Sequence, residues 1–161
     1  MKPIVFSIGD ATKPLGDGPK IISHICNDEG SWGRGFVLAL SKRSPEPEKA
    51  FRAWAKSGDG FGLGAVQFVR LDDKTEVANL IGQHRISRKT DAADAIPPVR
   101  YEAIREGLET IAKRALDTGA SVHMPRIGCG LAGGKWEIIA PIIEAALCAR
   151  EIEVFVYDLA A

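Results

Sequence analysis

The sequence has no net charge of either sign, because its 21 Lys and Arg residues are matched by 21 Asp and Glu residues. A protein that captures DNA or RNA by bulk electrostatics carries an excess of positive charge, so no direct nucleic-acid partner is expected. The sequence also lacks any run of about 18 apolar residues, the length that crosses a bilayer, so no membrane association is expected.

Cysteine is scarce as well. Cys26, Cys129 and Cys148 are odd in number and widely spaced, which fits neither a disulfide framework nor a zinc motif. The first residues lack the apolar core and the small-residue cleavage site of a signal peptide. We therefore expect a reduced, cytoplasmic protein that is monomeric and uses no metal or other cofactor.

The sequence does have enough apolar residues, 45%, for one domain with its own core over residues 1–161. Short apolar runs predict strands at residues 4–8, 21–26, 65–71, 76–82, 121–124 and 151–157. Amphipathic segments predict helices at residues 36–43, 46–56, 98–118 and 136–149, and the polar residues 83–96 predict an exposed loop. This alternation favours parallel strands with helices on both faces, in which ligands bind beyond the carboxyl ends of the strands.

Two glycine-rich loops share one layout, since each leaves a predicted strand and enters a predicted helix. The first spans residues 27–36 and the second residues 125–134. Glycine lets the backbone approach a ligand closely, and free N–H groups at a helix start attract phosphate oxygens. One such loop is an ordinary strand–helix turn, but two facing loops predict a cradle for a diphosphate. Neither loop has the Gly-Lys-Ser/Thr ending of a P-loop.

With these loops, the sequence resembles the macro domain family of ADP-ribose-binding modules over nearly its whole length. The resemblance rests on Gly9-Asp10-Ala11-Thr12, Trp32-Gly33-Arg34-Gly35 and Val156-Tyr157-Asp158-Leu159. Residues 124–131, followed by Trp136-Glu137, are similar to the subgroup that contains terminal ADP-ribose protein glycohydrolase and the ADP-ribose-1″-phosphate phosphatases. The resemblance implies a three-layer α/β/α macro domain fold, with a six-stranded mixed sheet and helices on both faces.

The resemblance also implies ligand-binding roles by position. Asp10, with Ala11 beside it, would accept a hydrogen bond from the adenine amino group. Tyr157 would stack near the adenine, although a packed core tyrosine is a comparable interpretation. Trp32 could reach the ligand from the first loop. The other expected contacts lie along the diphosphate and the distal ribose, at Gly33, Arg34, Gly35, Phe36, Gly128, Cys129, Gly130 and Leu131.

The expected catalytic groups depart from those of the nearest relatives. The related glycohydrolase uses a lysine after a Leu-Ile strand end and an aspartate after Gly-Leu in the second loop. Gln83 and Ala132 stand at these places and can perform neither role. The remaining hypothesis assigns catalysis to the first loop, where Asn27 and Asp28 would hold or activate a water while Gln83 orients the ribose.

Three functions are compatible with this pattern. The preferred one is hydrolysis of ADP-ribose from acidic side chains of mono-ADP-ribosylated proteins. The alternatives are an ADP-ribose-1″-phosphate phosphatase and a non-catalytic reader of ADP-ribose. The missing lysine and aspartate favour the reader, whereas the retained polar residues of the first loop favour an enzyme. In each case the expected partners are ADP-ribose or ADP-ribosylated proteins.

Overall fold

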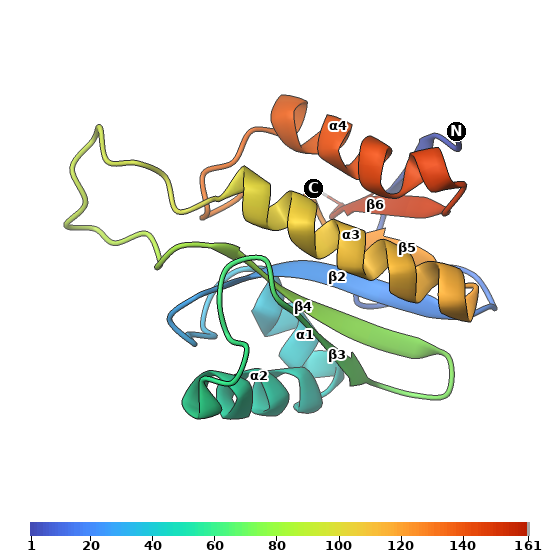
Figure 1. Ribbon diagram of the computed structural model, residues 1–161, viewed down its shortest axis with the longest axis horizontal. Coiled ribbons are helices and arrows are strands. Elements are labelled where there is room, and N and C mark those ends of the chain that lie inside the picture. Colours follow the sequence, from blue (N-terminus) through green and yellow to red (C-terminus); the bar gives the residue numbers. More distant parts are fainter. Residues whose placement is uncertain (161) are drawn as a thin grey trace.

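The computed structural model describes residues 1–160, which form a sheet of six strands between two layers of helices (Figure 1). The strands are β1 (Ile4–Ile8), β2 (Lys20–Asn27), β3 (Val66–Arg70), β4 (Thr75–Gln83), β5 (Ser121–Met124) and β6 (Val154–Asp158). The helices are α1 (Phe36–Arg43), α2 (Glu46–Ser57), α3 (Tyr101–Thr118) and α4 (Trp136–Ala146), followed by the short 3-10 helix η1 (Cys148–Arg150). Helices α3 and α4 cover one face of the sheet and α1 and α2 cover the other, which confirms the three-layer prediction.

The strand order is β1-β6-β5-β2-β4-β3, and every neighbouring pair is parallel except β3 and β4. The antiparallel pair is a hairpin whose turn is fixed by Asp72, because its Oδ1 accepts hydrogen bonds from the N–H groups of Lys74 and Thr75 at 2.9 Å. The sheet is therefore mixed, as predicted. Its parallel strands place their carboxyl ends along one edge, from β1 across to β4.

The core has two parts, one on each face of the sheet. The larger part lies under α3 and α4, where Ile104, Leu108 and Ile111 are fully buried. Helix α3 comes close to the sheet at Gly107, where an added Cβ would overlap the Leu80 side chain. The smaller part lies under α1 and α2 and contains Trp32, Leu40 and Phe51 among its residues.

Two predicted helices differ from the observed ones at their ends. The helix predicted from residue 98 begins at Tyr101. The backbone N–H groups just before it bond to other segments, since Val99 N–H donates to Ala132 O at 2.9 Å and Arg100 N–H donates to Gly82 O at 2.8 Å. The helix predicted to residue 149 ends at Ala146 and is followed by η1. Over residues 1–160, no helix combines the length and apolar character needed to cross a bilayer.

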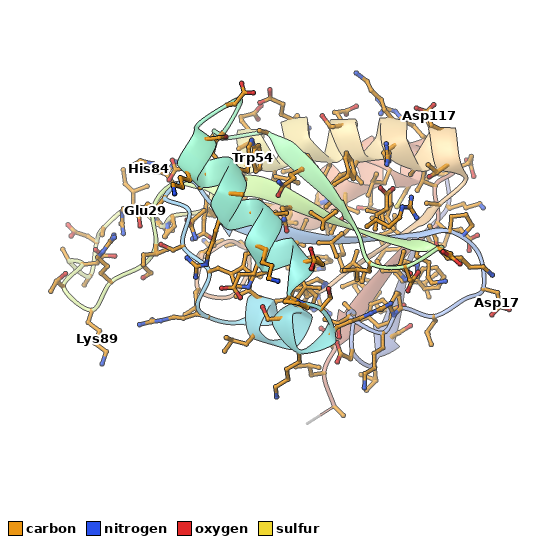
Figure 2. All side chains as sticks on the ribbon, turned by 90° about the horizontal axis from the view of Figure 1, so that it is seen from below. Asp17, Glu29, Trp54, His84, Lys89 and Asp117 are labelled. Atoms are coloured by element: carbon orange, nitrogen blue, oxygen red, sulfur yellow. The ribbon has the colours of Figure 1, made fainter. Side chains whose placement is uncertain are left out.

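The loop between β4 and α3 extends away from the body of the molecule (Figure 1). The prediction of an exposed loop over residues 83–96 is thus confirmed, except that Gln83 still belongs to β4. Figure 2 shows Glu29 and His84 at the base of this loop and Lys89 on its projecting part, with Asp17 and Asp117 at the opposite end of the molecule.

Candidate functional site

A cavity of about 520 Å³ lies at the carboxyl ends of the parallel strands, which is the predicted place for a ligand. Both glycine-rich loops and the first turns of α1 border it. We call it the first cavity, and its lining residues include Asp10, Arg34, Gly35, Gln83, Gly130 and Tyr157. The remaining expected contacts found in its wall are Ala11, Phe36, Gly128 and Leu131.

The end of the first cavity at β1 is built around Asp10. Its Oδ1 accepts hydrogen bonds from the backbone N–H of Thr12 at 2.8 Å and from the Thr12 hydroxyl at 2.7 Å. Arg43, the last residue of α1, donates to the Thr12 carbonyl and to Asp72, so the turn is held from a second side. One carboxylate oxygen of Asp10 therefore fixes the turn, and the side chain also lines the cavity.

Tyr157 closes the same end of the cavity and is held by its hydroxyl. The hydroxyl accepts from Leu15 N–H at 2.9 Å and lies 2.8 Å from His123 Nδ1. Burial, together with the charge of Lys20, lowers the pKa of His123 to about 4, so at neutral pH this neutral ring can accept a hydrogen bond from the tyrosine hydroxyl. With 5% of its surface exposed, Tyr157 is packed in the core and also forms part of the cavity wall, and its stacking against an adenine stays a prediction.

The middle of the first cavity is lined by backbone. Gly35 caps the start of α1 with φ 70°, a left-handed conformation that favours glycine, and no side chain caps this helix start. A Cβ added at Gly35 or Gly130 would meet no atom within 4 Å, and the same holds for Gly33, which lines the second cavity instead of the first. The free N–H groups of the first turn of α1 therefore border open space, the arrangement expected of an anion cradle.

A second cavity of about 450 Å³ continues from the far end of the first, and Arg34, Gln83 and Leu131 line both. Its polar lining comes from the first loop, from α2 and from the loop after β4, and contains two arginines and no carboxylate: Asn27, Ser31, Arg34, Arg52, Gln83 and Ser87. The site as a whole thus consists of a long compartment and a smaller, electropositive one beyond Gln83.

Asn27 and Gln83 are brought together, because they are paired at the ends of β2 and β4. Asn27 Oδ1 accepts from the N–H groups of Glu29 and Ser31 at 3.0 Å, and its Nδ2 donates to Ser31 O at 2.8 Å. Gln83 Nε2 donates to Arg85 O at 3.0 Å. Asn27 therefore fixes the shape of the first loop, and Gln83 keeps its amide oxygen for other partners.

Asp28 is not in the lining of either cavity, which differs from the expectation that it faces the ligand. Its Oδ1 accepts from Arg85 N–H at 2.7 Å and its Oδ2 lies 2.8 Å from His84 Nδ1. Burial alone would raise the pKa of Asp28, but these hydrogen bonds and the charge of His84 hold it below its usual value. Glu29 pairs with Arg88, so both carboxylates of the first loop are engaged by the loop after β4.

Trp32 and Cys129 also lie outside the lining of the first cavity. The Trp32 ring is 6% exposed, packs in the core beside Phe51, and donates from Nε1 to Ser41 Oγ at 2.8 Å, although it borders the second cavity. Cys129 is half-buried against the core, and burial raises the pKa of its thiol. Arg126, which lines the first cavity, lies over the rings of Phe6 and Trp136 and pairs with Asp158, so it also braces the second loop.

Sequence reasoning missed several lining residues, among them His24 and Arg52. His24 is 2% exposed, but it also lines the first cavity. It is held through Nε2 by Asn79 Oδ1 at 2.5 Å, and burial lowers its pKa to about 4. Arg52 comes from α2 and reaches the second cavity through a hydrogen bond to Trp32 O, a contact that no local motif predicts.

A further cavity of about 600 Å³ lies at the amino ends of β2 and β4, away from these groups. Its cations already hold the segment that follows Asp10. Lys20 donates to Gly16 O and Gly18 O, and Lys74 donates to Asp17 O. We therefore assign this cavity a structural role. Across the part of the chain that the structure describes, no cluster of His, Cys, Asp and Glu is arranged to hold a metal ion.

No family model matches the sequence. Three of the known proteins that are similar to it differ in the share of their own chain that the match covers. Chromodomain-helicase-DNA-binding protein 1-like of Mus musculus is 34% identical over 96% of this chain, which corresponds to 17% of that protein. ADP-ribose 1″-phosphate phosphatase of Chaetomium globosum is 31% identical over 90% of this chain and 86% of that protein. The solved structure of a macrodomain protein from Streptomyces coelicolor is 50% identical, with a TM-score of 0.83, and the match covers 96% of this chain and 98% of that one.

Proposed function

Because this chain belongs to the macrodomain family, we propose that it binds ADP-ribose in the first cavity and hydrolyses the bond between the distal ribose and the group attached to it. The observation that carries the proposal is the pair of joined cavities. The first is a long compartment that suits a dinucleotide-like ligand, and the second leaves room beyond it for an attached group.

The first cavity offers each part of ADP-ribose a matching environment. Asp10 supplies a carboxylate at the β1 end, where an adenine amino group could donate to it. The bare backbone at Gly35 and Gly130 suits a diphosphate, which needs N–H donors and close approach. The distal ribose would then reach Gln83 at the end of β4, the last of the parallel strands counted from β1.

The reaction that we propose takes place at the junction of the two cavities. The attached group is an acidic side chain of a modified protein, and the attacking species is a water. Gln83 keeps a free amide oxygen there to orient the ribose or the water, and Asn27 holds the first loop in place beside it. No lysine or carboxylate lines the second cavity, so we expect a turnover slower than that of relatives with a positioned base.

A phosphatase acting on ADP-ribose-1″-phosphate is the second candidate, and a specific observation favours it. Arg34 and Arg52 line the second cavity, and the one carboxylate that pairs with Arg52, Glu48 at 3.0 Å, stands outside the cavity wall. Two guanidinium groups suit a phosphate better than a protein chain, because arginine presents planar pairs of N–H donors. The name of the Chaetomium globosum relative describes such an activity for that protein.

Two assays separate these functions. Calorimetry with ADP-ribose should give micromolar affinity, about −8 kcal/mol. Single-turnover incubations with an auto-modified ADP-ribosyltransferase and with ADP-ribose-1″-phosphate should release ADP-ribose from the first substrate and, for the second candidate, phosphate from the other. Tight binding with no release from either substrate would replace the hydrolase by a reader, and absence of ADP-ribose binding would refute the proposal as a whole.

A further inference from the structure

The two edges of the sheet differ in how far their apolar side chains are exposed to solvent. On the β3 edge, the Phe68 ring is covered by the Arg114 guanidinium, whose carbon lies 5.0 Å from the ring centre. On the β1 edge, Arg126 lies over the Phe6 ring in the same way, 5.2 Å from its centre, but the apolar side chains remain more exposed: Val5 is 42% exposed, Phe6 51% and Ile8 74%. Proteins usually cover an apolar edge strand, because its free backbone groups can pair with another strand.

The backbone of β1 shows which groups are free to pair. Gly9 N–H donates to Asp158 O of the neighbouring strand at 2.8 Å. Successive residues of a strand point their N–H and C=O groups to alternate sides, so the odd-numbered residues of β1 face β6. The even-numbered residues Ile4, Phe6 and Ile8 therefore present their N–H and C=O groups outward. Pro3, which has no N–H, belongs to the odd-numbered set and removes no outward donor.

Within β1, two isoleucines, Ile4 and Ile8, stand at equal distances on either side of Phe6. In an antiparallel pair of two such strands centred on Phe6, each Ile4 lies opposite Ile8 of the second copy, and the two Phe6 residues face each other. Cross-strand aromatic and β-branched pairs of this kind stabilise sheets.

We propose that the β1 edge is the interface between two copies of this chain, paired antiparallel about a two-fold axis at Phe6. The outward N–H and C=O groups of Ile4, Phe6 and Ile8 match in this register, and so do their side chains. The two sheets then form one continuous sheet. Since the β1 strands run in opposite directions, the first cavities of the two copies open toward opposite ends of it, and each takes its own ligand.

The molar mass in solution tests this proposal, which differs from the monomer expected from the sequence. Sedimentation equilibrium should give twice the chain mass of 17.3 kDa. Phe6→Lys should give the single chain mass, because the two-fold axis places the new charges against each other. Leu116→Lys, at a position on α3 that is 56% exposed, adds the same charge away from β1 and should leave the dimer intact.

Charge complementation tests the register itself. Phe6→Glu alone should also be monomeric, and an equimolar mixture of Phe6→Lys and Phe6→Glu should recover the dimer mass, because residue 6 lies opposite itself only in this pairing. If the Phe6 variants lose their circular dichroism signal, Ile8→Lys makes the same test at the position opposite Ile4. A parent that stays monomeric at every concentration, or a Phe6 mixture that does not pair, would overturn the proposal. Calorimetry with ADP-ribose is independent of this outcome and judges the proposed function alone.

Discussion

Gly130 and Gly134 belong to the same loop but are glycines for different reasons. A Cβ at Gly134 would collide with the backbone oxygen of Gly128 and lie 3.0 Å from the Ile139 side chain. A Cβ at Gly130 would meet nothing within 4 Å, although this residue lines the first cavity. Gly134 is thus needed by the fold, whereas Gly130 leaves space for a ligand.

Gly130→Glu should abolish detectable ADP-ribose binding without unfolding the protein. The side chain has room in the free protein, but it fills the cavity and sets a negative charge against the diphosphate. Calorimetry and thermal unfolding of the same sample measure both properties. Gly134→Ala is the contrasting variant, and it should lower the free energy of unfolding by about 1–3 kcal/mol because of overpacking. Unchanged binding by a folded Gly130→Glu variant would place the ligand elsewhere.

Asp10→Asn should weaken ADP-ribose binding while keeping the turn. The amide oxygen can still accept the Thr12 hydrogen bonds, but the amide nitrogen replaces an acceptor by a donor that faces the adenine amino group. The loss should be about 1.5–3 kcal/mol, as for a hydrogen bond to a charged group. Calorimetry measures it, and Asp10→Ala should lose both the turn and the ligand contact. Equal affinity of parent and Asp10→Asn would remove Asp10 from the adenine site.

At the scale of elements, local patterns predicted most of the fold. The spacing of Ile104, Leu108 and Ile111 predicted helix α3, and the apolar, β-branched residues Ile21, Ile22 and Ile25 predicted β2. These patterns reflect burial on one face of a helix and on both faces of a strand. The orientation of Asp28 was not predictable in this way. Its partners Arg85 and His84 stand 57 and 56 residues further along the chain. Only the pairing of β2 with β4 brings them into reach of Asp28.

Asp28 therefore acts on the loop that follows β4. Asp28→Ala should increase amide hydrogen exchange over residues 84–98, because the loop base loses hydrogen bonds to Arg85 N–H and His84. Affinity for ADP-ribose should stay close to that of the parent, since Asp28 lines neither cavity. Mass-spectrometric hydrogen exchange measures the loop, and Asp94→Ala on the same loop is the charge-matched control. A turnover loss of about 10²–10⁴ without faster exchange would instead indicate a general base.

For the molecule as a whole, the sheet and the helices of its larger core are joined by an ion pair. Glu76 of β4 accepts from Arg114 of α3 at 2.9 and 2.6 Å, and its side chain is 8% exposed. The Arg114 hydrogen bond outweighs burial and holds the pKa of Glu76 below its ordinary value of 4.5. The folded state is therefore stabilised above that ordinary pKa, and the contribution disappears as pH falls through the lower pKa of the folded state.

Glu76→Gln should lower the free energy of unfolding at pH 7 by about 1.5–3 kcal/mol, the size of a charge-assisted hydrogen bond. The difference between parent and variant should stay constant from neutral pH down to the ordinary carboxyl pKa and shrink below it. Urea unfolding at a series of pH values measures this. Glu102→Gln, on the exposed side of α3, is the control and should change little, because its pair with Arg105 is open to solvent. A difference that grows at acid pH would contradict the assignment.

The sequence predicted the first cavity of the site but not the second. The two glycine-rich loops and Asp10 predicted a ligand cavity, because glycine-rich turns and a carboxylate at the ends of parallel strands are typical of ligand sites. The second cavity needs Arg52 from α2 and Ser87 from the loop after β4, together with Asn27. These residues share no motif, and they meet only through the packing of three separate segments.

The unequal burial of the three cysteines makes the protein suited to selective thiol labelling. Cys26 and Cys148 are 4% and 0% exposed, whereas Cys129 is half-buried between Gly128 and Gly130, which line the first cavity. Native alkylation should therefore attach a single reagent molecule, slowly, because burial raises the thiol pKa of Cys129. A fluorophore placed there reports cavity occupancy on the wild-type sequence, with no engineered cysteine to disturb it.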